Sequence, residues 1–108
     1  MSNVHEVTDV TFEEEVLQAS EPVLVDFWAT WCRPCLMIGS LIEELANENS
    51  GSIKVVKVDI DESRDVAAGY GVSSIPTLMV FKDGNVVERF VGMQSKNRLQ
   101  QAIDEAAG

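Results

Sequence analysis

The two cysteines of this 108-residue chain, Cys32 and Cys35, are separated by only two residues, Arg33 and Pro34. They follow a β-favouring run and open a segment with helical periodicity, so we expect Cys32 at an exposed helix start and Cys35 one turn further. Backbone N–H groups and the helix dipole stabilise an anion there, which lowers the pKa of the first thiol. A thiolate can attack a disulfide, and a second nearby thiol can release the mixed disulfide. The pair therefore predicts thiol–disulfide exchange, with Cys32 as nucleophile and Cys35 as resolving thiol.

Three alternatives stay open on the residues alone. A structural zinc site needs about four ligands, and two thiols with the single histidine, His5, would require a dimer. An inert buried pair is disfavoured because Trp31 and Arg33 flank Cys32 and suggest a surface position. A redox-sensing pair in another kind of enzyme is disfavoured because no second catalytic group of residues is evident.

Asp26 interrupts an otherwise apolar strand pattern six residues before Cys32. Burial would raise the pKa of its carboxyl group and let it exchange protons near neutral pH. The alternative is an aspartate at a strand end that reaches water. Lys57, in the next apolar strand pattern, could partly compensate the Asp26 charge or extend to the sheet edge. Trp28 is expected to pack beneath the cysteines.

Alternating strand and helix patterns must position these residues. Strands are predicted over 3–7, 23–28, 53–60, 77–81 and 86–91, and helices over 11–19, from the cysteines to about 49, over 63–70, and after Ser95. Thr11 and Glu14 have the spacing of a capping box, and 82–85 reads as a hairpin connection. This order predicts an α/β domain with a mixed four- or five-stranded sheet and helices on both faces.

Length and charge exclude several functions. One domain over residues 1–108 is expected, and the net charge of −10 argues against binding nucleic acid or anionic membranes. No apolar run approaches the roughly 18 residues of a membrane span, and no secretory signal is evident at the N-terminus. A transit peptide removed from a longer precursor would leave no trace. The acidic clusters at 13–15 and 59–65 are interpreted as solvated faces.

Several segments together resemble the thioredoxin family over essentially the whole chain: 25–35, Lys57-Val58-Asp59, Ile75-Pro76-Thr77 and Gly92. The resemblance implies a three-layer fold and a protein-disulfide reductase without metal or organic cofactor. A thioredoxin reductase would supply its electrons, and disulfide-containing proteins would be its targets. We expect a monomer in the cytoplasm, or in an organelle if a transit peptide was removed.

The resemblance also assigns residue roles. Asp26 would serve Cys35 as proton acceptor and donor, and Pro76 would be a cis-proline opposite the dithiol. The residue before that proline would pair with a substrate strand. Arg33, Pro34 and Lys57 would support the site. An apolar rim for target proteins would comprise Trp31, Ile75, Val91, Gly92 and Met93, although each of these could equally be ordinary half-exposed core.

The chain departs from the family pattern near the cysteines. Arg33 stands where glycine is usual, Leu36 where lysine is usual, and Gly39-Ser40 where a proline usually bends the helix. These differences bear on redox potential and on reductase and target preference, not on the reaction class. Two rival functions are a disulfide oxidase or isomerase, and a non-catalytic binding subunit that uses the same fold.

Overall fold

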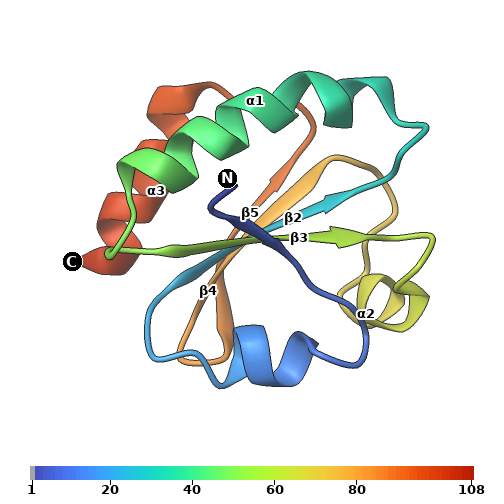
Figure 1. The fold of residues 1–108 in the computed structure, drawn as a ribbon, viewed down its shortest axis with the longest axis horizontal. Helices are drawn as coiled ribbons and strands as arrows, with labels where there is room; N and C mark the ends of the chain where they lie inside the picture. The colour runs from blue at the N-terminus through green and yellow to red at the C-terminus, as the bar shows by residue number, and fades with distance from the viewer. Residues whose placement is uncertain (1) are drawn as a thin grey trace.

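The computed structural model describes residues 2–108, in which five strands form a single sheet: β1 (Val4–Glu6), β2 (Val23–Trp28), β3 (Lys54–Asp59), β4 (Thr77–Lys82) and β5 (Asn85–Val91). The strand order is β1-β3-β2-β4-β5 (Figure 1). β1 pairs with β3 and β3 with β2 in parallel, whereas β2–β4 and β4–β5 are antiparallel. The sheet is therefore mixed and five-stranded, and β2, which leads to the cysteines, lies at its centre.

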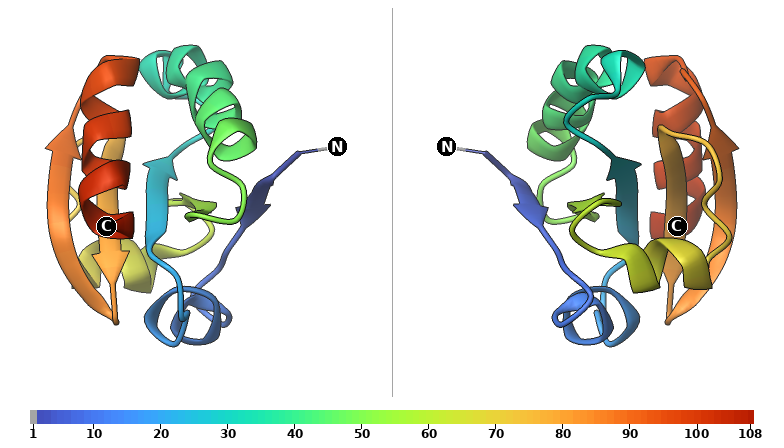
Figure 2. Two further views of the ribbon diagram at one scale, coloured as in Figure 1. Left: turned by 90° about the vertical axis from the view of Figure 1, so that its left-hand side faces the viewer. Right: turned by 90° about the vertical axis from the view of Figure 1, so that its right-hand side faces the viewer.

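Within residues 2–108, three α-helices and one short π-helical segment cover the sheet: α1 (Arg33–Glu48), α2 (Arg64–Gly69), α3 (Lys96–Ala107) and η1 (Glu13–Leu17). α1 and α3 lie on one side of the sheet, and η1 and α2 lie on the other (Figures 1 and 2). Each side has its own cluster of buried apolar residues. The central strands are buried on both faces, which explains their near-continuous apolar sequence. The predicted three-layer α/β fold is confirmed.

The first helix differs from its prediction. The Thr11 side chain caps no helix; its hydroxyl oxygen accepts a hydrogen bond from the Thr8 N–H at 3.0 Å. The N–H groups of Thr11 and Phe12 both donate to the Thr8 carbonyl oxygen, so a turn already begins at Thr8. Thr11 lies inside that turn and cannot act as its cap. The capping-box prediction is wrong, although Phe12 is buried beneath the segment as the apolar spacing indicates.

Two other local predictions are confirmed. The Ser95 hydroxyl oxygen accepts a hydrogen bond from the Arg98 N–H at 3.2 Å and caps α3. The hairpin between β4 and β5 turns through Asp83 and Gly84, both with positive φ, as a tight two-residue connection requires. No helix in residues 2–108 combines the length and apolar character needed to cross a membrane.

Candidate active site

Cys32 and Cys35 lie between the end of β2 and the first turn of α1, as the sequence predicts. Cys32 is the N-cap residue, and its sulfur accepts a hydrogen bond from the Cys35 N–H at 3.2 Å. Pro34 fits the first turn because the N–H that it lacks would have no helical partner there. The two cysteines form a disulfide, with Cα atoms 5.3 Å apart. When the pair is reduced, the same N–H and the helix dipole stabilise a Cys32 thiolate.

The burial of Cys32 departs from expectation. Only 5% of the residue is exposed, so the prediction of an exposed Cys32 holds for its place at the helix start but not for its side chain. Ala29 and the half-buried Trp28 and Ile75 pack around the disulfide. Cys32 Sγ also lies 3.8 Å from the Ile75 carbonyl oxygen. The Cys32 sulfur therefore lies at the face between Ile75 and the start of α1.

The segment before β4 completes that face. The Ile75–Pro76 peptide bond is cis, as the resemblance implies. The Gly92 N–H donates to the Pro76 carbonyl oxygen at 2.8 Å, which brings the end of β5 to the same place. Ile75, Pro76 and Gly92 are thus assembled beside Cys32. The remaining rim residues are all exposed at this end of the molecule: Trp31, Val91 and Met93.

Asp26 is buried within β2, with 4% of the residue exposed and no hydrogen-bond partner for its Oδ1 among residues 2–108. The alternative in which it reaches water at a strand end is therefore wrong. Burial disfavours the charged form and raises the pKa of Asp26 from 3.8 to about 7, while the positive charge of Lys57 opposes that rise. Lys57 Nζ lies 5.0 Å from the centroid of the Trp28 ring. A carboxyl group with this pKa can both accept and donate a proton near neutral pH.

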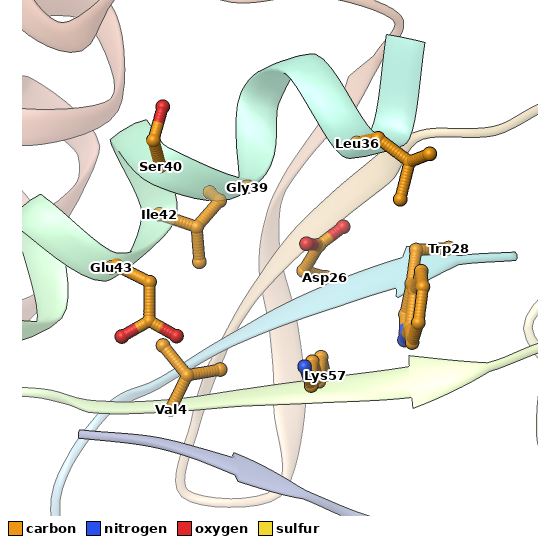
Figure 3. A pocket seen from close by; sticks show the side chains of 9 residues that line it. All are labelled: Val4, Asp26, Trp28, Leu36, Gly39, Ser40, Ile42, Glu43 and Lys57. Carbon is orange, nitrogen blue, oxygen red and sulfur yellow. The ribbon is translucent and has the colours of Figure 1, made fainter. Parts of the chain in front are cut away.

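A pocket of about 220 Å³ opens beside Asp26, between α1 and the strands (Figure 3). Its polar lining comes from Lys57 on β3 and from Ser40 and Glu43 on α1. The other lining residues are Val4, Trp28, Leu36, Gly39 and Ile42. The buried carboxyl group of Asp26 therefore borders this pocket. The spacing of residues in the sequence does not predict this pocket, because it depends on how α1 packs against the sheet.

One acidic residue near the site, Asp59, was misinterpreted as part of a solvated face, whereas Asp61 is exposed as that interpretation expects. Asp61 accepts a hydrogen bond from the Trp31 Nε1–H at 2.7 Å and so fixes the indole ring beside Cys32. Asp59 is buried, and its Oδ1 accepts a hydrogen bond from the Asp61 N–H at 2.9 Å. The burial of Asp59 could have been inferred from its position at the carboxyl end of an apolar strand, β3, where its register partner is Trp28 of β2.

Arg89 was also missed. From β5, its guanidinium donates to the carbonyl oxygens of Tyr70 and Gly71 at 2.8 and 2.9 Å. These carbonyls lie at the end of α2, where the segment leading to Ile75 begins. Arg89 therefore anchors the start of the loop that leads to Ile75 and the cis peptide bond. An arginine in a half-exposed strand gives no sequence signal for such a contact.

Arg33 is exposed at the start of α1. Among residues 2–108, no carboxylate lies within 4.0 Å of the Arg33 guanidinium, and the guanidinium forms no hydrogen bond. The same part of the chain contains no group of three His, Cys, Asp or Glu side chains arranged to hold a metal ion.

Comparison with known proteins gives a consistent result. The thioredoxin family model matches residues 3–105. Thioredoxin 1 of Synechococcus elongatus is 51% identical over 105 residues, which cover 97% of this chain and 98% of that protein. The thioredoxin of Pseudomonas aeruginosa is 52% identical over 98 residues, which cover 91% of each chain. The thioredoxin of Chlorobaculum thiosulfatiphilum is 45% identical over 103 residues and 95% of each chain.

Proposed function

This chain belongs to the thioredoxin family of thiol–disulfide oxidoreductases, and we propose that Cys32 is its nucleophile and Cys35 its resolving thiol. Its reaction is the reduction of protein disulfides. The observation that carries the assignment of roles is the N-cap position of Cys32, whose sulfur accepts the Cys35 N–H. That arrangement stabilises negative charge on Cys32 rather than on Cys35.

The reaction proceeds in two exchanges. The Cys32 thiolate attacks one sulfur of the target disulfide, forms an intermolecular disulfide and releases the other target sulfur as a thiolate. Cys35 then loses its proton to the Asp26 carboxylate and attacks Cys32 Sγ, which releases the second target thiolate. Two electrons pass from the dithiol to the target, and the Cys32–Cys35 disulfide remains. The raised pKa of Asp26 supports its role as the proton acceptor.

The target backbone binds beside the cis-proline. The Ile75 carbonyl oxygen lies 3.8 Å from Cys32 Sγ, so a target strand that pairs with Ile75 brings its own sulfur close to the nucleophile. The exposed side chains of Trp31, Val91 and Met93 supply apolar contacts around that strand. The Trp31–Asp61 hydrogen bond holds one side of this rim in place.

Family membership implies reductase partners and disulfide-containing targets in general. We propose a thioredoxin reductase as the electron donor and a monomer as the working unit. A reducing compartment such as the cytoplasm suits a carrier that must be kept as a dithiol, and an organelle interior suits it if a transit peptide was removed. The acidic charge disfavours nucleic acid and anionic membranes as partners. One domain over residues 1–108 is supported by the single continuous sheet.

Insulin reduction tests this function. Chemically reduced wild-type protein should reduce insulin disulfides, Cys32→Ser should be inactive, and Cys35→Ser should accumulate a mixed disulfide through Cys32. Val87→Ser, at the hairpin end of β5, is the matched surface control and should match the wild type. A Cys32→Ser variant that kept full biological activity would instead favour a non-catalytic binding subunit. A mixed disulfide that formed through Cys35 would reverse the assigned roles.

A further inference from the structure

Most of the exposed large apolar side chains of residues 2–108 lie on the segments around the dithiol. Of the eight large apolar side chains that are exposed among residues 2–108, three form the rim already described: Trp31, Val91 and Met93. Two more, Leu36 and Met37, lie in the first turns of α1. A cluster of exposed apolar residues marks a surface that binds another molecule. The two exchanges described above involve neither Leu36 nor Met37, although Leu36 also lines the pocket beside Asp26, so the exposure of these two side chains requires a separate explanation.

Leu36 and Met37 share one face of α1 with Arg33. Positions i, i+3 and i+4 of a helix lie side by side, which makes these three residues neighbours on the surface. Leu36 is 57% exposed and Met37 is 64% exposed, whereas the next residue, Ile38, is buried on the core side of the helix. The solvent face of an amphipathic helix normally carries polar residues. Here its first turns carry two apolar side chains and one cation.

This face adjoins the nucleophile directly. The Leu36 N–H donates to the Cys32 carbonyl oxygen at 3.1 Å, so Leu36 lies one helical turn beyond Cys32. Arg33 follows Cys32 in the chain, and its guanidinium has no carboxylate within 4.0 Å among residues 2–108. A free cation beside an apolar surface is complementary to a segment with an acidic and an apolar side chain.

We propose that Arg33, Leu36 and Met37 form a second binding surface, termed here the α1 arm, which selects target segments with an acidic and an apolar residue next to the reactive cysteine. The proposal rests on the proposed function and adds a target class to it. The apolar residue covers Leu36 and Met37, and the acidic residue pairs with Arg33. The occupant is an extended polypeptide segment of a target protein, continuous with the strand that pairs with Ile75.

Short synthetic peptides test the α1 arm. Each peptide has one cysteine as a mixed disulfide with mercaptoethanol, a neutral leaving group. The peptides combine Leu or Ser with Glu or Gln beside the cysteine, and the pair is placed on the N-terminal side in one set and on the C-terminal side in the other. Reduction of bis(2-hydroxyethyl) disulfide, which has the same leaving group and no side chains, is measured in parallel.

In at least one set, the Leu peptide should react about fivefold faster than the Ser peptide, because burial of half a leucine side chain favours the complex. Glu should react about twofold faster than Gln, and added salt should remove that difference. Leu36→Ser should abolish the Leu preference, and Arg33→Gln should abolish the Glu preference. Rates are expressed relative to the small disulfide, so a change in sulfur reactivity does not mimic a change in selectivity.

Val87→Ser is the matched control, since Val87 is a 51% exposed apolar residue at the far end of β5. It should keep both preferences. The proposal is overturned if the Leu preference stays below about twofold in both peptide sets, if the Glu and Gln peptides react equally in both sets, or if Leu36→Ser and Arg33→Gln keep the wild-type preferences. Failure to reduce bis(2-hydroxyethyl) disulfide would instead contradict the proposed function itself.

Discussion

Asp26 and Lys57 are register partners on the parallel strands β2 and β3, yet they form no ion pair within 4.0 Å. The Lys57 ammonium instead lies over the Trp28 ring, 5.0 Å from its centroid. Its positive charge lowers the pKa of Asp26 from a distance without holding the carboxylate in a salt bridge. The carboxyl group therefore keeps a pKa of about 7, which a close ion pair would prevent.

Asp26 should destabilise the oxidised protein above neutral pH. Its pKa is higher in the folded protein than in the unfolded chain. The free energy of unfolding therefore falls as pH rises from about 4 to about 7, and ionisation of Asp26 causes no further fall at higher pH. A pKa difference of about 3 corresponds to about 4 kcal/mol. The cavity left by the side chain costs about 1–3 kcal/mol at any pH, so Asp26→Ala should gain about 1–3 kcal/mol near pH 8 and lose about 1–3 kcal/mol near pH 4. Denaturant unfolding at both pH values measures both effects.

Asp59→Ala is the matched control for that experiment. Asp59 is also a buried carboxylate, but it accepts a hydrogen bond from the Asp61 N–H. Its removal should lower stability by about 1–2 kcal/mol. In kinetics, Asp26→Ala should slow resolution of the mixed disulfide more than its formation. Lower stability near pH 8 together with unchanged resolution would identify Asp26 as structural.

Lys57→Met should raise the pKa of Asp26 further, because it removes the charge that opposes the effect of burial. The pH range in which the oxidised protein loses stability should then extend upward beyond about 7. Urea unfolding across pH 6 to 9 measures the shift, and Lys54→Met serves as a control on the same strand. Lys54 Nζ lies 2.7 Å from Oε1 of Glu15, so Lys54 pairs with Glu15 rather than with Asp26. An unmoved pH profile in Lys57→Met would show that Lys57 has no electrostatic effect on Asp26.

Arg33→Gly should make the protein more reducing. A guanidinium next to the nucleophile favours the ionised, reduced form and has no comparable effect on the neutral disulfide. Coulomb's law gives on the order of 1 kcal/mol at intermediate dielectric, which corresponds to about 15–30 mV for this two-electron couple. The pKa of the Cys32 thiol should rise in the variant, because the neighbouring positive charge is removed. Equilibration with glutathione at low and high salt measures the potential, and a shift of opposite sign or without salt dependence contradicts the electrostatic explanation.

Arg89→Ala should loosen the loop that leads to Ile75. The variant loses both hydrogen bonds from the guanidinium to the carbonyls of Tyr70 and Gly71, at a cost of about 1 kcal/mol for partly solvated bonds. Amide hydrogen exchange should become faster in residues 72–75, and the KM for insulin should rise while the reaction with a small disulfide changes less. Arg89→Lys, with one charged donor group, should restore part of the protection. Uniform loss of protection across the chain would indicate general destabilisation instead.

The sequence was sufficient for the parts of the fold that depend on periodicity. The apolar run of β2 and the i, i+3, i+4 spacing in α1 fix which faces are buried, and together they place Cys32 at a helix start. Thr11 shows the limit of such reasoning, because a capping pattern does not reveal that a turn has already begun at Thr8. The burial of Asp26 and the roles of Asp61 and Arg89 depend on which strands are neighbours, and local sequence spacing does not contain that information.

Strand β1 determines which changes at the N-terminus the fold tolerates. Its three residues pair with β3 and occupy a backbone edge that would otherwise be open at Val55 and Val56. An uncovered edge of this apolar kind is a template for pairing between molecules and for aggregation. A fusion tag placed before Ser2 should therefore be tolerated, whereas trimming the chain through Glu6 should produce insoluble or self-associated protein even though every residue of the dithiol site remains.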